Sequence, residues 1–467
     1  MSSMSRSLFG LIGAVLLILT FFTLRPNSVS SVQSRSPSDG AQELPSWFHE
    51  HSNKDDSVLQ KVYNIDEAAD SASTPSTVSS EPSISSPTII DNLMDIHNDS
   101  LGFEKVLMVS LPARSDKQDS FAVQARITNF SYTQIDGVYG KDIDEKALPQ
   151  GMSTKHPGVN QIGCWRAHLD AMRYIVKNNI QSAVIMEDDA NWDVALKHQL
   201  VQFARGSRWL VNQDEDVMPS SPYGDGWDML WLGHCSSLYV DSDPRRWVIP
   251  NDPTVIPPHL RDGYYKPDMT AWEAWNSTHP QASNSTRVVF KSGWNTCFAA
   301  YAVSLRGAMK ILLHMSMLPV SEPIDNGVGN MVKYPDSHSN FSAITSFPTI
   351  FGISRPAGSA SKNSDIESYS NVINTKPTAE RLQFPIRKNI DQMLRGGDEF
   401  EGEYFEEHMY NKPGEWKTPH KRKWADIIGA VGHAETVEKV VDENGWEHWQ
   451  ATRVDGDLGS TSDEFLG

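Results

Sequence analysis

The stretch Ala183-Val184-Ile185-Met186-Glu187-Asp188-Asp189 decides the fold, because a short apolar run ends there in three consecutive carboxylates. Four apolar residues without alternation, two of them β-branched, predict a strand buried on both faces, as in a parallel sheet covered by helices. Ligands of open α/β sheets bind beyond the carboxyl ends of the strands, where these acids would lie. Side chains alternate along a strand, so we expect Glu187 and Asp189 to face one way and Asp188 the other.

The carboxylates indicate a divalent-cation site. Oxygen ligands facing a crevice suit Mg²⁺ or Mn²⁺, which complete their coordination with water and substrate phosphates. The net charge of −18 argues against a nucleic-acid partner. An acidic protein that binds an anionic nucleotide-sugar needs a cation to bridge the two. We therefore predict Glu187 and Asp189 as metal ligands; a solvated acidic turn after the strand is the alternative.

The two ends of the 467-residue chain differ in composition from its middle. Residues 8–24 form an uncharged apolar run of about the shortest length that spans a bilayer. This run predicts a transmembrane signal anchor, with residues 1–7 in the cytosol, although a cleaved signal peptide is an alternative. Residues 25–100 are rich in Ser, Pro and Thr, which predicts a disordered stem. Residues 371–467 form a polar carboxyl-terminal extension, with a helix expected at 435–443 and no catalytic signal.

The sequons, together with the apolar amino-terminal segment, favour the lumen of the secretory pathway. Five Asn-x-Ser/Thr sequons mark plausible surface positions, at Asn98, Asn129, Asn276, Asn284 and Asn340. No Cys-x-x-Cys spacing occurs, which excludes a zinc ribbon or a thioredoxin-like motif. In an oxidising compartment one pair of the three cysteines can be bridged and one thiol stays free; the sequence does not say which among Cys164, Cys235 and Cys297.

Residues 101–370 carry the pattern of one folded domain that opens with two strand–turn units. The first strand is followed by a polar turn that contains Arg114 and by a helix. The second strand closes on Asp136 and Gly137, which can hold a ribose hydroxyl or let the backbone approach a ligand. An ordinary turn is the alternative at that position.

A helix at 163–178 precedes the quoted stretch, and its apolar stripe contains Cys164 and His168. We therefore interpret His168 as a buried hydrogen-bonding brace of the sheet rather than a proton shuttle. Further strands are expected at 227–234, 295–303 and 347–353, with a helix capped by Ser304 and a loop that carries Asp325. The irregular insert at 240–290 is the candidate acceptor region, because its aromatic side chains can stack on sugars or else pack the insert onto the domain.

Four blocks, in their order and spacing, resemble glycosyltransferase family 25, the group that contains lipooligosaccharide and collagen galactosyltransferases. They are Val109-Ser110-Leu111-Pro112-Ala113-Arg114, Ile135-Asp136-Gly137-Val138-Tyr139-Gly140, Gly163-Cys164-Trp165-Arg166-Ala167-His168 and Ile185-Met186-Glu187-Asp188-Asp189. Later blocks at 227–233, at 296–307 with Asp325, and at 364–366 are also similar, so the resemblance covers residues 104–366. The chain departs from the family pattern at Ser110, where Asn is usual, and at Ala167, where Ser precedes the His.

The resemblance implies an α/β fold of the GT-A nucleotide-diphospho-sugar transferase type, a Rossmann-like mixed sheet flanked by helices. It also implies inverting transfer of a hexose, most often galactose, from a UDP-sugar to a hydroxyl of a glycan or glycoprotein acceptor. By matching motifs, the site residues are Glu187 and Asp189 for the metal and diphosphate, and Arg114, Asp136 and Gly137 near the nucleotide.

The expected mechanism uses Mn²⁺ or Mg²⁺ and a carboxylate base that takes the acceptor proton. Asp325 is the predicted base, with Asp188 as its rival. The expected location is the Golgi or endoplasmic reticulum membrane, as a single-pass type II protein with a lumenal catalytic domain. Two alternatives stay open: a degenerate carbohydrate-binding or scaffold protein on the same fold, and a metal-dependent hydrolase, which the absence of a His-rich ligand set disfavours.

Overall fold

The computed structural model describes residues 91–214, 216–240, 242–257, 285–366, 372–404, 420–430 and 434–454. The predicted cytosolic tail, the anchor at 8–24, most of the stem, and residues 258–284 of the aromatic insert lie outside these ranges. Among the helices described, none combines the length and the hydropathy that crossing a membrane requires. Folded structure begins before the predicted end of the stem at residue 100, since the 3₁₀ helix η1 (Asn92–His97) buries Ile96 completely.

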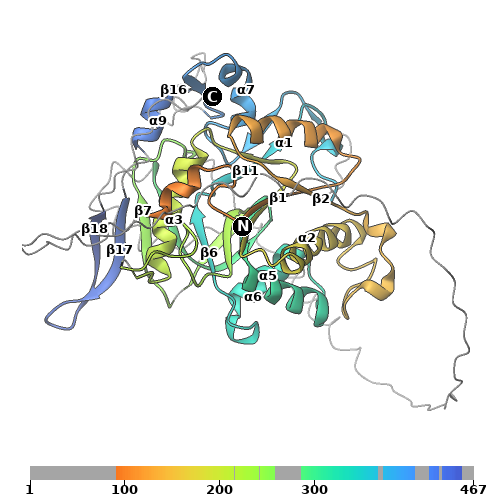
Figure 1. The fold of residues 1–467 in the computed structure, drawn as a ribbon, viewed down its shortest axis with the longest axis horizontal. Coiled ribbons are helices and arrows are strands. Elements are labelled where there is room, and N and C mark those ends of the chain that lie inside the picture. Colours follow the sequence, from red (N-terminus) through yellow and green to blue (C-terminus); the bar gives the residue numbers. More distant parts are fainter. Residues whose placement is uncertain are drawn as a thin grey trace, which may run out of the picture. The chain divides into compact units, whose positions relative to one another are not determined.

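An 11-stranded mixed sheet forms the centre of the fold, with the strand order β18-β17-β7-β8-β10-β5-β9-β3-β1-β2 and β6 paired to β8 (Figure 1). The part that matters for the site is parallel, because β1 pairs in parallel with both β2 and β3. Antiparallel β9 lies between β3 and β5. The bounds of these strands are β1 (Lys105–Ser110), β2 (Thr133–Asp136), β3 (Ser182–Glu187), β5 (Met229–Gly233), β7 (Arg246–Ile249), β8 (Arg287–Thr296), β9 (Ala300–Ser304), β10 (Ala343–Phe347), β17 (Ala434–Val441) and β18 (Glu447–Val454).

Helices cover both faces of this sheet. On one face Val184 and Met186 of β3 share a core with Phe121, which comes from α1 (Ser115–Ile127), and with residues of α3 (Leu196–Leu210). On the other face Ala183 and Ile185 pack with α2 (Val159–Lys177), α5 (Leu305–Leu312) and α6 (Ile324–Lys333), which Figure 1 shows gathered together. The strand is thus buried on both sides, as its unbroken apolar run predicts. The predicted fold class, a mixed α/β sheet flanked by helices of the GT-A type, is confirmed.

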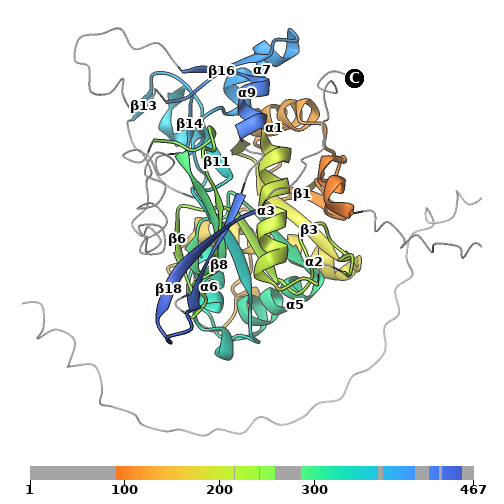
Figure 2. The ribbon, with the colours of Figure 1, turned by 90° about the vertical axis from the view of Figure 1, so that its left-hand side faces the viewer.

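Residues beyond 370 also contribute strands. β14 (Thr378–Glu380) pairs with β11 (Phe351–Arg355). In the large sheet, β17 pairs with β7 on one side and with β18 on the other, and Figure 2 shows β17 and β18 side by side. The prediction of a helix at 435–443 is therefore wrong. Thr436, Val437, Val440 and Val441 are β-branched, and pairing with β7 and β18 decides in favour of an extended strand.

Two expected strands are each divided in the structure. The segment 295–303 contains the end of β8 and the start of β9, separated by a turn in which Cys297 has a φ of 66°. Likewise 347–353 contains the end of β10 and the start of β11. The remaining short elements are β4 (Ala190–Trp192), β6 (Ser236–Tyr239), β12 (Gly358–Ser359), β13 (Ile373–Asn374), β15 (Glu399–Glu401), β16 (Lys421–Lys423), α7 (Ile386–Leu394), α9 (Trp424–Ala430), the 3₁₀ helices η2 (Gly140–Asp142), η3 (Glu145–Ala147), η7 (Pro335–Ser337) and η8 (Ala360–Lys362), and the π-helical turn η6 (Leu313–Met317).

A buried ion pair fastens the start of β8 to two loops. Arg287 Nε lies 2.8 Å from Asp252 Oδ2, and both side chains are almost fully buried. Arg287 Nη1 also donates to the carbonyl oxygens of Pro348 (2.6 Å) and Thr349 (2.7 Å), in the loop between β10 and β11. Every partner of this guanidinium is therefore removed from water. Loss of the guanidinium would leave these buried acceptors without a hydrogen-bond donor.

We expect Arg287→Met to lower the free energy of unfolding by about 3–5 kcal/mol, because it leaves the Asp252 carboxylate buried without its cation. Arg306→Met is the matched control. Arg306 also pairs with a buried acid, Asp228, but its side chain is 52% exposed and Lys310 stays at 2.7 Å as a second partner. That variant should lose about 1 kcal/mol or less. Denaturant-induced unfolding measures both, and equal losses would contradict the role assigned to Arg287.

Candidate active site

A cavity of about 240 Å³ opens at the carboxyl ends of the parallel strands β1, β2 and β3. This is the edge of an α/β sheet at which ligands bind. All three acids of the quoted stretch line it, together with Gly137, which was predicted near the nucleotide. Its wall also includes residues from the first turn of α1, from the amino-terminal half of α2 and from a later loop, namely Lys117, Asn160, Gly163, Cys164, Ala167, His168, Ser364, Asp365 and Ile366.

Lys117, which sequence reasoning missed as a site residue, neutralises two of the acids. Its Nζ lies 2.9 Å from Asp188 Oδ1 and 3.1 Å from Asp189 Oδ2. Ser110 Oγ donates to the other oxygen of Asp188 at 2.8 Å. The expected alternation, with Asp188 facing away from Asp189, is therefore wrong. β3 ends at Glu187 and a turn follows, so both aspartates reach the same lysine.

The charges at this cavity change the pKa of Lys117 and that of Asp188. Burial lowers the pKa of Lys117, but the charges of Asp189 and Asp188 more than offset this, and its pKa lies above the usual value. Burial raises the pKa of Asp188 to about 6, against the opposing effect of Lys117. Asp189 Oδ1 is buried and has no hydrogen-bond partner. A buried carboxylate oxygen without a partner is an available ligand for a divalent cation, so the residues present fit Mn²⁺ or Mg²⁺.

Glu187, the last residue of β3, points to a different set of partners. His168 Nε2 lies 3.2 Å from Glu187 Oε1, and His168 Nδ1 lies 2.9 Å from the hydroxyl of Tyr301. His168 is 2% exposed, which confirms the prediction of a buried hydrogen-bonding histidine. One helical turn earlier is Cys164, whose thiol pKa is raised by burial and by nearby carboxylates. The Sγ of Cys164, a ring nitrogen of His168 and a carboxylate oxygen of Glu187 all lie within 4.8 Å of one another.

Two glycines bring the loop after β2 against α2. A Cβ on Gly140 would stand 1.7 Å from the carbonyl oxygen of Val159, and one on Gly163 would stand 2.7 Å from that of Val138. Neither position therefore accepts a larger residue without moving the backbone. This close packing places the loop that begins at Gly137 and the first turns of α2 on the same wall of the cavity.

Arg114 and Asp136, both predicted near the nucleotide, do not line the cavity. Arg114 pairs with Asp116 at 2.9 Å and with Asp365, and it donates to the carbonyl oxygen of Lys362 at 2.8 Å. It thereby holds the loop that carries Asp365 to the cavity wall. Asp136 is exposed at the end of β2 and accepts a hydrogen bond from Gln134.

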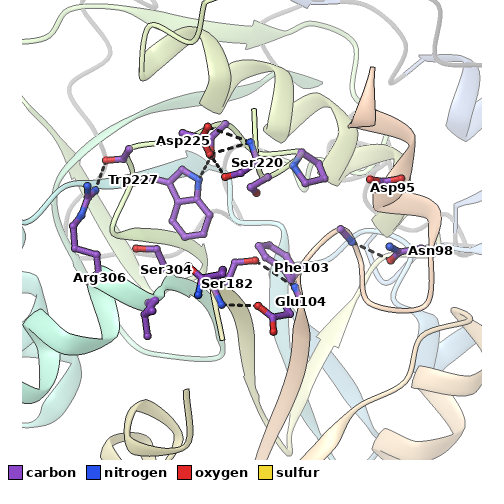
Figure 3. A pocket seen from close by; sticks show the side chains of 17 residues that line it. Asp95, Asn98, Phe103, Glu104, Ser182, Ser220, Asp225, Trp227, Ser304 and Arg306 are labelled. Atoms are coloured by element: carbon purple, nitrogen blue, oxygen red, sulfur yellow. Dashed lines mark hydrogen bonds between the residues drawn. The ribbon is translucent and has the colours of Figure 1, made fainter. Parts of the chain in front are cut away.

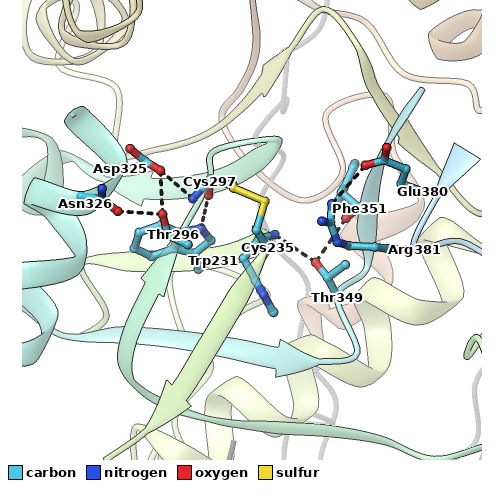
Figure 4. Close-up of a disulfide and its surroundings, with 11 residues drawn as sticks. Trp231, Cys235, Thr296, Cys297, Asp325, Asn326, Thr349, Phe351, Glu380 and Arg381 are labelled. Atoms are coloured by element: carbon cyan, nitrogen blue, oxygen red, sulfur yellow. Dashed lines mark hydrogen bonds and ion pairs between the residues drawn. A yellow bond between two sulfur atoms is a disulfide. The ribbon is translucent and has the colours of Figure 1, made fainter. Parts of the chain in front are cut away.

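Asp325, the predicted base, lies at the start of α6 beside the disulfide between Cys235 and Cys297 (Figure 4). Its Oδ2 accepts hydrogen bonds from Thr296 Oγ1 and from the backbone N–H of Cys297, each at 2.8 Å. Asp325 does not line the cavity, but its charge acts on Cys164, which does. The structure therefore places it next to the cavity wall, separate from the three acids that follow β3.

Arg387 of α7 is a second residue that sequence reasoning missed. Its Nε and Nη2 are buried without hydrogen-bond partners, and the charges of Asp189 and Asp188 act on it. α7 packs against α1, which carries Lys117. A polar segment some 200 residues beyond the acids thus brings another cation toward them.

A larger cavity, of about 580 Å³, lies near the amino ends of β1 and β3, and Figure 3 shows the side chains that line it. Three of its charged side chains already have partners: Glu104 accepts from the backbone of Gln181, Asp225 accepts from Ser220, and Arg306 pairs with Asp228. Trp227 is only 3% exposed, so it offers no open aromatic face. The smaller cavity, with its convergent acids, is therefore the better candidate for chemistry.

Part of the chain is similar to known glycosyltransferases. Residues 103–214 match the family model described as glycosyltransferase family 25 (LPS biosynthesis protein), so the resemblance is confirmed over that range. The chain is 28% identical over 159 residues to procollagen galactosyltransferase 1 of Danio rerio, covering 32% of this chain and 24% of the relative. It is 22% identical over 238 residues to probable inactive glycosyltransferase 25 family member 3 of Bos taurus, covering 48% and 31%. Each of these matches spans less than a third of the relative's length.

Proposed function

We propose that this chain, whose residues 103–214 match glycosyltransferase family 25, transfers a hexose from a UDP-sugar to a hydroxyl of a glycan or glycoprotein. Galactose is the first candidate, because two of the relatives are named procollagen galactosyltransferases. The observation that carries the proposal is the cavity at the carboxyl ends of three parallel strands, lined by Glu187, Asp188, Asp189 and Lys117.

The donor diphosphate is assigned to the charged end of this cavity. Glu187 and Asp189 are the proposed ligands of a divalent ion, which when bound would neutralise charge on the departing diphosphate. Lys117, which is shared between Asp188 and Asp189 in this structure, supplies a buried positive charge at the same place. Gly137 also lines this cavity, where the absence of a side chain lets the nucleotide approach the backbone.

In the chemical step, the oxygen of the acceptor hydroxyl bonds to the anomeric carbon. The bond from that carbon to the diphosphate oxygen breaks, and the departing UDP keeps both electrons. Asp325 takes the hydroxyl proton as general base. Its position outside the donor cavity, with Oδ2 oriented by two hydrogen bonds, suits a base that faces the acceptor. Attack from the side opposite the leaving group inverts the anomeric centre.

The proposed location is the lumen of the Golgi or endoplasmic reticulum, with residues 8–24 as the anchor of a single-pass type II protein. Two observations support it. The disulfide between Cys235 and Cys297 forms in an oxidising compartment. The sequon residues Asn98, Asn129 and Asn340 are all exposed, as glycosylation requires.

A degenerate carbohydrate-binding or scaffold protein is the second candidate. It is favoured by the similarity to a relative named probable inactive and by the departures at Ser110 and Ala167. The structure gives Ser110 a defined role, since its hydroxyl donates to Asp188. Ala167 lines the cavity beside His168 without removing either hydrogen bond of that ring. The two departures therefore leave the acids and their partners in place.

The full chain should release UDP from one of a panel of UDP-sugars when Mn²⁺ and an acceptor glycoprotein are present, with UDP-galactose expected to be preferred. Chelation should reduce release to background, and added Mn²⁺ should restore it, because the proposed metal ligands are carboxylates that cannot stabilise the diphosphate alone. Calorimetric titration with UDP and Mn²⁺ is the companion measurement. Absence of both turnover and metal-dependent UDP binding would reject the transferase proposal in favour of the scaffold.

A further inference from the structure

Three side chains that line the cavity form a cluster, and of these the transferase chemistry above uses Glu187 alone. Cys164 and His168 are four residues apart on α2, so they lie on the same face of the helix. Glu187 reaches them from the end of β3. One ligand atom from each of the three lies within 4.8 Å of the others, and His168 Nε2 is 3.2 Å from Glu187 Oε1. A sulfur, a nitrogen and an oxygen therefore converge on one point.

The spacing suits a tetrahedral metal ion. Bonds of about 2.0–2.3 Å to zinc place neighbouring ligand atoms about 3.3–3.8 Å apart, so the cluster needs to contract by about 1.5 Å at most. A helix readily places two ligands one turn apart on the same face, and a third ligand can then come from a neighbouring element. All three residues line the cavity, so a fourth coordination position would face the space assigned to the donor.

The donor set selects the kind of metal. A thiolate and an imidazole favour Zn²⁺ and similar ions, whereas Mg²⁺ and Mn²⁺ prefer oxygen ligands. The charges of Glu187, Asp189 and Asp325 all act on Cys164, so the negative potential around its sulfur attracts a cation. Asp189, by contrast, is held by Lys117, whose Nζ lies 3.1 Å from its Oδ2, and it is not one of the three residues whose ligand atoms converge.

The hydrogen bond that would orient His168 toward a metal ion is already formed. His168 Nδ1 lies 2.9 Å from the hydroxyl of the fully buried Tyr301, which fixes the ring so that Nε2 faces Glu187. Phe298 packs edge-on against the same ring at a centroid distance of 5.2 Å. With a metal on Nε2, the ring proton stays on Nδ1 and is donated to Tyr301, the outer-shell contact that ligating histidines usually make.

We propose that Cys164, His168 and Glu187 bind one thiophilic divalent ion of the Zn²⁺ type, with its open coordination position facing the donor cavity. The proposal does not rest on the transferase function, although the two sites share Glu187. Cys235 and Cys297 are joined in a disulfide, so Cys164 is the single free thiol among the three cysteines of the sequence. A metal–thiolate signal from this protein can therefore come from Cys164 alone.

In the test, the full chain is treated with a chelator and then titrated with Co²⁺ in the absence of nucleotide. The readout is the near-ultraviolet charge-transfer absorption from thiolate to cobalt. We expect a band that saturates at one ion per chain and disappears when Zn²⁺ is added. Zn²⁺ should also slow alkylation of Cys164 at least tenfold. No band, or an unchanged alkylation rate at excess Zn²⁺, would overturn the proposal.

Cys164→Ser, which is nearly isosteric, should abolish the band while the circular dichroism spectrum of the fold is kept. An unchanged band in that variant would also overturn the assignment. Asp189→Asn separates this inference from the proposed function, because Asp189 is outside the cluster of three ligands. That variant should keep the cobalt band and lose Mn²⁺-dependent UDP binding; loss of the band in it would place the ion elsewhere and reject the site.

Discussion

Replacing Asp189 by Asn should lower kcat/KM for Mn²⁺-dependent UDP-sugar turnover by about 10²–10³-fold or more, with the fold intact. The substitution keeps the size of the side chain and an oxygen that can accept from Lys117, but it removes the charge. Asp189 Oδ1 is buried without a partner, so an oxygen available to a cation is lost. The reason for the large effect is that a cation held by this carboxylate in a water-excluded site would stabilise a departing diphosphate far more than the same cation in water.

The matched control is Asp119→Asn, the same change on the exposed face of α1, which also carries Lys117. It should alter turnover less than twofold. Steady-state kinetics over a range of Mn²⁺ concentrations measures both variants, and calorimetry with UDP and Mn²⁺ reports whether the donor still binds. An Asp189→Asn enzyme with wild-type turnover and an unchanged Mn²⁺ response would remove the central premise of the proposed function.

The sequence contains enough to place these acids but not their partners. An apolar run without alternation indicates a strand covered on both sides, and parallel strands end at the edge where ligands bind. That reasoning brings Glu187, Asp188, Asp189 and Gly137 to one cavity, as found. It fails at the turn after Glu187, because the rule of alternating side chains holds only within the strand.

Lys117 and Arg387 could not be found in this way. A lysine in the first turn of a helix ordinarily lies in solvent, and nothing local shows that it contacts acids 72 residues later. Arg387 comes from a segment whose polar composition indicates no core, yet α7 packs on α1. Both contacts depend on how distant elements pack, which residue patterns do not encode. The same applies to β17, where pairing with β7 overrides the expected helix.

Asp325→Asn should lower kcat for sugar transfer by about 10²–10⁴-fold, the range that a positioned general base contributes. Thr296 Oγ1 and the Cys297 N–H can still donate to the Asn oxygen, so the start of α6 should keep its place. Asp325 does not line the donor cavity, and we therefore expect the affinities for UDP and Mn²⁺ to stay within about twofold of wild type. This pattern differs from that of Asp189→Asn, in which metal-dependent donor binding itself is lost.

Kinetics with the acceptor varied separates the two candidate bases. Asp188 binds Lys117 and Ser110 through different oxygens and is 8% exposed, so its carboxylate is occupied in holding the cavity together. Asp188→Asn should therefore weaken donor binding, whereas Asp325→Asn should impair transfer with the donor still bound. Asp336→Asn, an exposed acid just after α6, is the control and should be neutral. If Asp325→Asn transfers sugar normally while Asp188→Asn binds UDP and fails to transfer it, Asp325 is rejected as the base and the role passes to Asp188, because catalysis then stops at Asp188 with the donor still bound.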